Sequence, residues 1–153
     1  MISAPEVITT EAQAAAVVRL TIPRAEMRTA FGPAVGELLK GLAAQGVEPI
    51  GGVFAHHLRM PPDMFDFELG IKVAALVTAA GRVQPGALPA VRAARTVYSG
   101  GYEGLPGAWG AFMAWIKENG HAPAEDLWEV YAVGPQSSSN PADWRTELVR
   151  PLT

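Results

Sequence analysis

The chain contains the segment Pro33-Ala-Val-Gly-Glu-Leu-Leu-Lys-Gly-Leu-Ala-Ala-Gln-Gly46 and, at an offset of 74 residues (107 − 33), the related segment Gly107-Ala-Trp-Gly-Ala-Phe-Met-Ala-Trp-Ile-Lys-Glu-Asn-Gly120. In both segments, apolar residues recur at the i, i+3, i+4, i+7 spacing of an amphipathic helix. They are Val35, Leu38, Leu39 and Leu42 in the first segment and Trp109, Phe112, Met113 and Ile116 in the second. Two such units predict a pseudo-symmetric domain, and the seam between its halves is a usual place for a small-molecule site.

Strands are predicted around each helix. In the first half, residues 7–22 have an extended pattern, with helix as an alternative in their alanine-rich middle, and residues 49–58 and 65–73 follow as strands. The second half repeats this order with residues 87–98, 127–133 and 146–152, and the loop at 134–141 lengthens the offset to 79 (146 − 67). We predict an α+β fold of duplicated β-α-β-β units with pseudo-two-fold symmetry, in which two main helices lie on one face of an antiparallel sheet beside a ligand cleft. The chain is expected to be a single domain over 1–153, with repeats at about 5–80 and about 82–153.

Proline and glycine are expected to set the ends of the helices. Pro33 suits the first turn of the first helix, and Gly46 suits its carboxyl-terminal cap. In the second unit Pro106 opens a helix that Asn119 and Gly120 close.

Composition excludes several classes of function. The 153 residues are 49% hydrophobic and 18% charged, which is typical of a globular protein. A net charge of −3 without a basic patch argues against nucleic-acid binding, and the longest apolar run, residues 73–80, is too short to cross a bilayer. The absence of cysteine excludes disulfides and thiolate sites, and together with the lack of a visible secretory signal it predicts a cytoplasmic location.

No metal and no cofactor are predicted. His56 and His57 are adjacent in a strand, so they point to opposite faces and cannot bind one ion together. His121 has no second ligand at a recognised spacing.

Glu129 is the strongest candidate for chemistry, because it interrupts an otherwise apolar strand and its counterpart in the first repeat is Ala55. Alternation places Glu129 and Tyr131 on one face and Trp128 and Val130 on the other. If the second pair packs on the helices, Glu129 faces the opposite side of the sheet. The rarity of buried glutamate favours a solvated side chain. The functional alternative is a carboxylate in an aromatic pocket, which would attract an organic cation or act as a general base with a raised pKa.

Aromatic residues gather in the second half, which holds all four tryptophans and all three tyrosines. Trp109 is assigned to the core because it lies on the helix stripe, whereas Trp115 lies at its edge and suits either a cleft wall or a core rim. Aromatic rings near an acid serve as walls or cation–π partners. Trp128 is the weakest of these candidates, because alternation places it opposite Glu129. The predicted ligand-binding set is Glu129, Tyr131, Tyr102, Trp115, Trp128, Trp144 and His57.

Four motifs follow one another in the second half: Ser99-Gly-Gly-Tyr-Glu-Gly-Leu105, Trp115-Ile-Lys-Glu-Asn-Gly120, Trp128-Glu-Val-Tyr131 and Arg145-Thr-Glu-Leu-Val-Arg-Pro-Leu152. Their order and spacing resemble the GyrI-like family, the effector-binding domain of AraC-type and multidrug-sensing transcription regulators, here in a stand-alone form. The resemblance implies a hydrophobic cleft with Glu129 as its central carboxylate. In drug-sensing relatives this acid meets cationic, aromatic compounds. In some stand-alone relatives a cleft glutamate and an aromatic residue support hydrolysis of reactive cyclopropane-containing natural products.

The predicted function is therefore small-molecule binding. A lipophilic molecule, cationic or aromatic, would bind in an apolar cleft around Glu129, for drug or effector sensing or for sequestration. The alternative is a hydrolase with Glu129 as the catalytic residue and a tyrosine hydroxyl assisting the leaving group. A protein-binding adaptor is a third reading of an apolar cleft. The candidate protein partners are a second copy of the chain and a separate regulator, and no direct contact with nucleic acid or membrane is expected.

Overall fold

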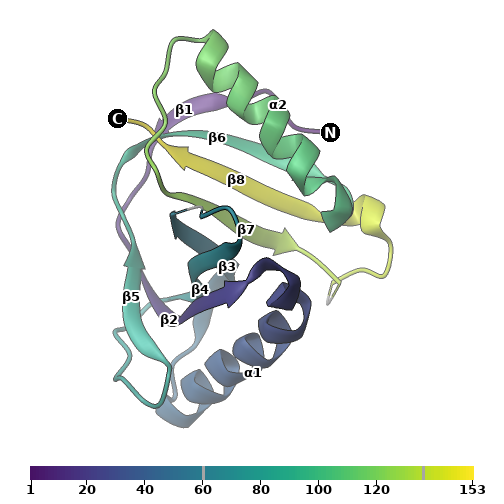
Figure 1. The fold of residues 1–153 in the computed structure, drawn as a ribbon. Coiled ribbons are helices and arrows are strands. Elements are labelled where there is room, and N and C mark those ends of the chain that lie inside the picture. The colour runs from purple at the N-terminus through teal and green to yellow at the C-terminus, as the bar shows by residue number, and fades with distance from the viewer. Residues whose placement is uncertain (60, 136) are drawn as a thin grey trace.

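One antiparallel sheet of eight strands organises the computed structural model, which describes residues 1–59, 61–135 and 137–153 (Figure 1). The strands lie in the order β1-β6-β8-β7-β3-β4-β2-β5. Their bounds are β1 (Glu6–Thr9), β2 (Gln13–Pro23), β3 (Pro49–Arg59), β4 (Met64–Val73), β5 (Gln84–Leu88), β6 (Arg92–Ser99), β7 (Leu127–Val133) and β8 (Arg145–Pro151). The predicted α+β class is confirmed. Within the predicted 134–141 loop, Gln136 lies outside the described residues.

The strand order is symmetric about the central pair of β3 and β7. Reading outward from it, β4 matches β8, β2 matches β6 and β5 matches β1. Ala55 pairs directly with Glu129, its equivalent at the 74-residue offset, so the pseudo-two-fold axis passes between them. Ala55 also pairs with Leu69 and Glu129 with Leu148, which reproduces the offset of 79 (148 − 69). The structure therefore agrees with the duplicated pattern of the sequence.

Each half contributes one main helix, α1 (Met27–Gln45) and α2 (Leu105–Glu118). Gly46 ends α1 in the left-handed conformation (φ 65°), and Pro106 lies in the first turn of α2, both as predicted. The expectation for Pro33 was wrong, because α1 begins at Met27 and Pro33 lies inside it. The apolar stripe continues upstream through Phe31 and Met27, whose packing against the core holds the additional helical residues.

Two predicted strands are each divided in the structure. The segment 7–22 forms β1 and β2, and the segment 87–98 forms β5 and β6. The first break is fixed by Thr10, whose hydroxyl donates to the carbonyl oxygens of Pro89 and Val91 at 2.8 and 3.1 Å. The sequence pattern did not reveal these breaks, because β-branched and small residues continue on both sides of each one. The chain stays extended there and only the neighbouring strand changes.

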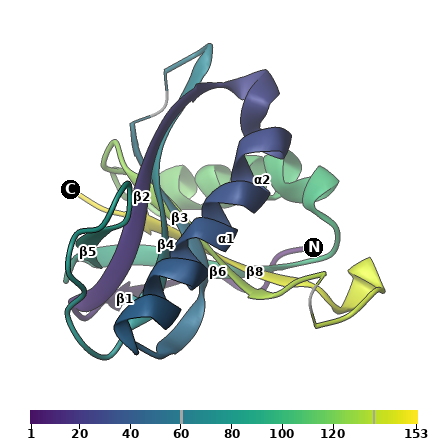
Figure 2. The ribbon, with the colours of Figure 1, turned by 90° about the horizontal axis from the view of Figure 1, so that it is seen from below.

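Both helices pack on the same face of the sheet, as predicted. Leu38 of α1 shares a core cluster with Leu69 of β4, and Phe112 of α2 shares one with Leu148 of β8. Figure 2 shows that the axes of the two helices run in different directions. Among the described residues, no helix combines the length and apolar character needed to cross a membrane.

The opposite face of the sheet is also buried, and Trp128 and Val130 pack there with Phe54. Small residues such as Ala15 of β2 and Ala93 of β6 belong to the same cluster and let the two wings of the curved sheet approach each other. The sequence predicted that Trp128 and Val130 share one face of the sheet but left open whether the helices cover that face, and they do not. Glu129 and Tyr131 lie on the helix-covered face instead.

Candidate functional site

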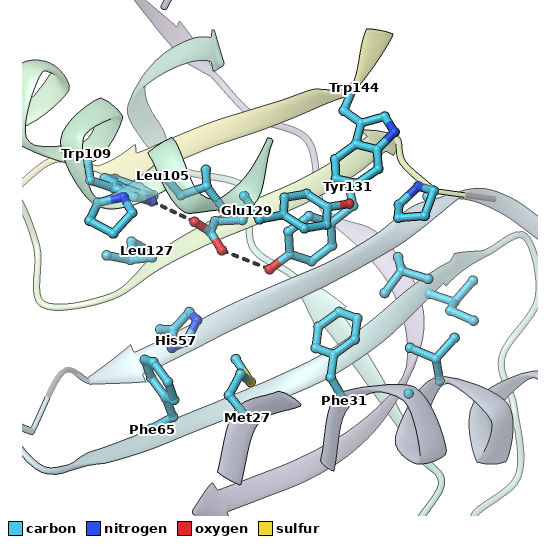
Figure 3. Close-up of a pocket in the computed structure, with 18 of the residues that line it drawn as sticks. Met27, Phe31, His57, Phe65, Leu105, Trp109, Leu127, Glu129, Tyr131 and Trp144 are labelled. Atoms are coloured by element: carbon cyan, nitrogen blue, oxygen red, sulfur yellow. Dashed lines mark hydrogen bonds between the residues drawn. The ribbon is translucent and has the colours of Figure 1, made fainter. Parts of the chain in front are cut away.

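A cavity of about 1250 Å³ lies between α1 and α2, over the central strands β3 and β7 (Figure 3). Both halves of the chain line it. The lining from α1 includes Met27, Phe31 and Val35, and the lining from α2 includes Leu105 and Trp109. Most of the lining side chains are apolar, and the charged ones are Arg24, Glu103, Glu129 and Arg150.

Glu129 is the buried acid of this cavity, with 9% of its surface exposed. The indole N–H of Trp109 donates to its Oε2 at 2.7 Å, and the hydroxyl of Tyr131 donates to its Oε1 at 2.8 Å (Figure 3). Each oxygen keeps a further lone pair for another donor. Among the basic side chains that the structure describes, which do not include that of Arg28, none forms an ion pair with this carboxylate.

The register of the sheet explains how Glu129 reaches this place. Alternation along β7 puts Leu127, Glu129 and Tyr131 on the helix face. The residue directly opposite is Ala55, which is fully buried and whose short side chain leaves room for the carboxylate. Because α2 begins at Leu105, Trp109 lies about one turn beyond the start of the helix, and its indole N–H reaches the carboxylate.

Burial shifts the titration of the polar groups around Glu129. It raises the pKa of the Glu129 carboxyl, while the hydrogen bonds from Trp109 and Tyr131 act in the opposite direction. Burial and the neighbouring carboxylate raise the pKa of Tyr131 well above its usual value and also raise that of Tyr102. Both phenols therefore remain protonated donors at neutral pH.

Aromatic rings continue from Tyr131 along the cavity. Phe31 and Tyr102 each meet Tyr131 edge-on, with ring centroids 5.6 and 5.7 Å away. Tyr102 in turn lies 5.0 Å from Trp144, whose indole N–H donates to the carbonyl oxygen of Ser138 at 2.9 Å. These rings place electron-rich faces and electropositive edges near the acid, an arrangement suited to an aromatic or cationic ligand.

His57 lines the cavity from β3, on the side of the first half. Its ring stacks on Phe67 with centroids 4.9 Å apart and meets Phe65 at 5.5 Å. Burial, with smaller contributions from His56 and Arg24, lowers the pKa of His57 to about 4, so the ring is neutral at pH 7.

The neighbouring His56 is oriented as the strand alternation predicts. Its Nε2 lies 2.8 Å from Asp126, and its ring meets Trp128 on the helix-free face. Among the described residues, no three histidine, aspartate or glutamate side chains gather in a way that could hold a metal ion.

The cavity brings together five of the predicted site residues, namely Glu129, Tyr131, Tyr102, Trp144 and His57. Trp128 does not line it, because it packs on the opposite face of the sheet. Trp115 does not line it either, since this side of α2 turns toward His121, on which the indole stacks at 5.9 Å. The structure therefore gives no place in this cavity to these two tryptophans.

Sequence reasoning missed Trp109 and the aromatic residues of the first half, Phe31 and Phe65. Trp109 was assigned to the core because its stripe position is the same for a core residue and for a cavity wall. One signal was present in the sequence, since the equivalent of Trp109 in the first repeat is the much smaller Val35. A large residue beside the axis in only one repeat indicates a local function.

A family model described as the GyrI-like small molecule binding domain matches residues 3–153. No curated protein matched the chain in sequence.

Several solved structures share the fold. The C-terminal domain of EcmrR is 19% identical, with a TM-score of 0.85 and coverage of 98% of this chain and 97% of that chain. The EcmrR chain in its complex with DNA is 20% identical, with a TM-score of 0.84. The match covers 97% of this chain but only 57% of the EcmrR chain. A hydrolase from Listeria innocua is 12% identical with a TM-score of 0.72, covering 97% and 91% of the two chains. SAV2435 bound to tetraphenylphosphonium is 8% identical with a TM-score of 0.61, covering 99% and 94%. At these identities the likeness shows the fold alone.

Proposed function

The chain belongs to the GyrI-like small-molecule-binding family, and on that premise we propose that it binds lipophilic organic cations in the cavity around Glu129. The observation that carries the proposal is a buried carboxylate with two hydrogen-bond donors and no cationic partner among the side chains that the structure describes. A buried charge without a partner is unfavourable, so a ligand that supplies the opposite charge is bound with a gain that a neutral ligand lacks.

The two arginines of the cavity do not take the place of such a ligand. The Arg24 guanidinium donates to the carbonyl oxygens of Pro61 and Pro62, and that of Arg150 donates to the carbonyl oxygen of Ala124. Because both are engaged with the backbone, the negative charge of Glu129 stays available to a ligand.

The rings beside Glu129 support an aromatic or lipophilic body for this cation. Tyr131, Tyr102 and Trp144 form a continuous set of contacts on one side of the cavity. Such rings attract a cation through their faces and bury the apolar surface of its substituents. A cavity of about 1250 Å³ has room for a drug-sized molecule.

Titration with tetraphenylphosphonium, the compound bound in the structure of SAV2435, tests the proposal. Calorimetry is expected to show saturable binding to the wild type and an affinity at least about tenfold lower for Glu129→Gln, which keeps the shape and removes the charge. Glu118→Gln is the matched control, because Glu118 is exposed and outside the cavity. Equal affinity of the wild type and Glu129→Gln would show that the carboxylate has no charge role.

A hydrolase of reactive cyclopropane-containing compounds is the second candidate, and the hydrogen bond between Tyr131 and Glu129 favours it. Glu129 would accept a proton from water as the water oxygen bonds to a ring carbon. The strained carbon–carbon bond would break, and its electron pair would take up a proton from a tyrosine hydroxyl, which the proton held by Glu129 then restores.

Mass spectrometry separates the two candidates. The protein is incubated with an excess of a strained cyclopropane electrophile, and the water adduct is counted per protein molecule over time. Many turnovers, lost in Glu129→Gln, would favour the hydrolase. Retention of one unchanged molecule per chain would favour the binding protein.

We place this function in the cytoplasm, on the basis of a chain without cysteine. Two outcomes of binding are proposed there: sequestration of the ligand by this chain, and sensing together with a separate DNA-binding regulator. Coupling of ligand to such a regulator requires a ligand-dependent complex, which pull-down with and without tetraphenylphosphonium measures.

A further inference from the structure

His57 occupies the place in the first half that Tyr131 occupies in the second. The two residues are 74 positions apart (131 − 57), and each lies two residues from the axis pair of Ala55 and Glu129. Figure 3 shows His57 with Phe65 and Met27 on the side of the cavity across from Trp109, Glu129 and Tyr131. The cavity thus has a carboxylate side and a largely apolar side with one imidazole.

The pseudo-symmetry explains why the imidazole of His57 has no hydrogen-bond partner among the described side chains. Tyr131 donates to Glu129 two residues away, but the residue at the equivalent place beside His57 is Ala55, which has no acceptor. Nδ1 of His57 is fully buried without a hydrogen bond, and Nε2 forms none with any described residue. Buried polar groups are nearly always paired, so this one calls for an explanation.

The surroundings of the ring fix its orientation and protonation. Stacking on Phe67 at 4.9 Å holds the plane of the imidazole. The ring is neutral at pH 7, since burial lowers the pKa of His57 to about 4. A buried N–H without an acceptor is rarer than a buried acceptor without a donor, so the proton is placed on Nε2 and not on the enclosed Nδ1. Because the ring lines the cavity, Nε2–H is the group that a ligand can reach.

We infer that His57 is a second recognition point, which donates a hydrogen bond from Nε2 to an oxygen of the ligand. The inference rests on the proposed function and narrows it. The preferred ligands are amphipathic cations that meet Glu129 with the cationic part and carry a hydroxyl, ether or carbonyl oxygen on the part that reaches His57. A cation of purely hydrocarbon surface, such as tetraphenylphosphonium, binds without using this point.

Four probes test the inference: tetraphenylphosphonium and the 2-, 3- and 4-hydroxyphenyl derivatives of triphenylphosphonium. All four carry the same phosphonium charge and have nearly the same size. The three derivatives differ from one another only in the position of one hydroxyl, which the parent lacks. In the wild type at least one isomer is expected to bind about fivefold or more tightly than the parent, the effect of one hydrogen bond to an otherwise unpaired group. In His57→Phe this advantage is expected to disappear, so that the isomers and the parent bind the variant with affinities within about twofold of one another.

Two further variants make the result specific. His57→Gln keeps an N–H near the position of Nε2 and is expected to recover part of the advantage, which a merely structural role of the ring would not do. His121→Phe is the matched control, because His121 lies outside this cavity.

Failure of this inference differs from failure of the proposed function. Binding of the parent that depends on Glu129, with no isomer favoured or with the preference intact in His57→Phe, would overturn the role of His57 alone. Absence of parent binding to the wild type would remove the proposed function and this inference together.

Discussion

Glu129 accepts hydrogen bonds from two donors, yet none of the described side chains supplies a cation to balance its charge. The hydrogen bonds from Trp109 and Tyr131 stabilise the charged form, whereas burial favours the neutral form and is the larger effect. The pKa of Glu129 is therefore raised above the ordinary value of 4.5. This one side chain is expected to set the pH dependence of binding and to lower the stability of the unliganded protein.

The affinity for a permanently charged cation is expected to fall as the pH is lowered through the raised pKa of Glu129. Binding requires the carboxylate, so the dissociation constant of tetraphenylphosphonium should increase about tenfold per pH unit below that pKa and stay constant above it. Tyr131 and Tyr102 remain protonated throughout, because their pKa values are raised.

Calorimetric titrations between about pH 5 and 8.5 measure this profile, with Glu129→Gln as the control that should be flat. The range stays above the pKa of about 4 of His57, so that the imidazole does not add a charge. A profile of the same shape in the wild type and the variant would contradict the assignment of the titration to Glu129.

Glu129→Gln is expected to stabilise the unliganded protein at neutral pH. A carboxyl whose pKa is raised in the folded state contributes stability below the unfolded pKa and loses it as the pH rises through the folded pKa. Removing the charge should therefore raise the melting temperature at pH 7.5 by a few degrees, equivalent to about 1 kcal/mol, and change it little at pH 4.

Thermal unfolding followed by circular dichroism at both pH values checks this. Glu118 is exposed, so Glu118→Gln should change the free energy of unfolding by less than about 0.5 kcal/mol at either pH. A lower melting temperature of Glu129→Gln at pH 7.5 would mean that the carboxylate is stabilised by more than its two hydrogen bonds.

The residues of the site could be predicted only in part from the sequence. Glu129 and Tyr131 could be predicted, because strand alternation places them on one face and the comparison with Ala55 singles out the acid. Trp109 was not, because the helical stripe is the same whether the helix contacts the sheet directly or stands above a cavity. Trp128 was placed on the correct strand face but given a ligand role that its packing with Val130 does not support.

The helices α1 and α2 are equivalent in the repeat but differ at their starts. In α2 the helix begins just before Pro106, whereas α1 begins six residues before Pro33 (33 − 27). The sequence predicted the existence and carboxyl ends of both helices, because the apolar stripe and Gly46 are strong signals. It did not predict the start of α1, because proline is usual in the first turn of a helix. Phe31 and Met27 are recognised as part of the apolar stripe only when the helix is extended toward the amino terminus beyond Pro33.

Pro33→Ala is expected to stabilise the protein by about 1 kcal/mol or more, because proline inside a helix lacks the N–H that would donate to the carbonyl oxygen four residues before it. Pro106→Ala, the matched control, should give no gain, since proline in the first turn sacrifices no helical hydrogen bond. Urea denaturation measures both. Equal effects of the two substitutions would contradict the placement of Pro33 inside α1.

The two halves of the molecule share their central strands and their buried faces. β3 and β7 pair at the axis, and the cluster on the helix-free face combines Phe54 of the first half with Trp128 and Val130 of the second. We propose on these grounds that residues 1–153 form a single domain of two repeats, at about 5–80 and about 82–153, in which neither repeat is stable alone.

One cooperative transition is therefore expected on chemical unfolding. All four tryptophans lie beyond residue 97, so tryptophan fluorescence reports the second half, whereas far-ultraviolet circular dichroism also reports α1. The two signals should give the same midpoint in urea. Separate midpoints would show that the halves unfold independently and would contradict the single domain.

The central claim, that a buried carboxylate selects cations in this cavity, is tested most directly with a pair of probes of equal shape and opposite charge. Tetraphenylphosphonium and tetraphenylborate are titrated calorimetrically into the wild type and Glu129→Gln at pH 7.5. The phosphonium is expected to bind the wild type at least about tenfold more tightly than the borate, and this preference should largely disappear in Glu129→Gln. Equal binding of both ions to the wild type, or a preference that persists in the variant, would contradict the claim.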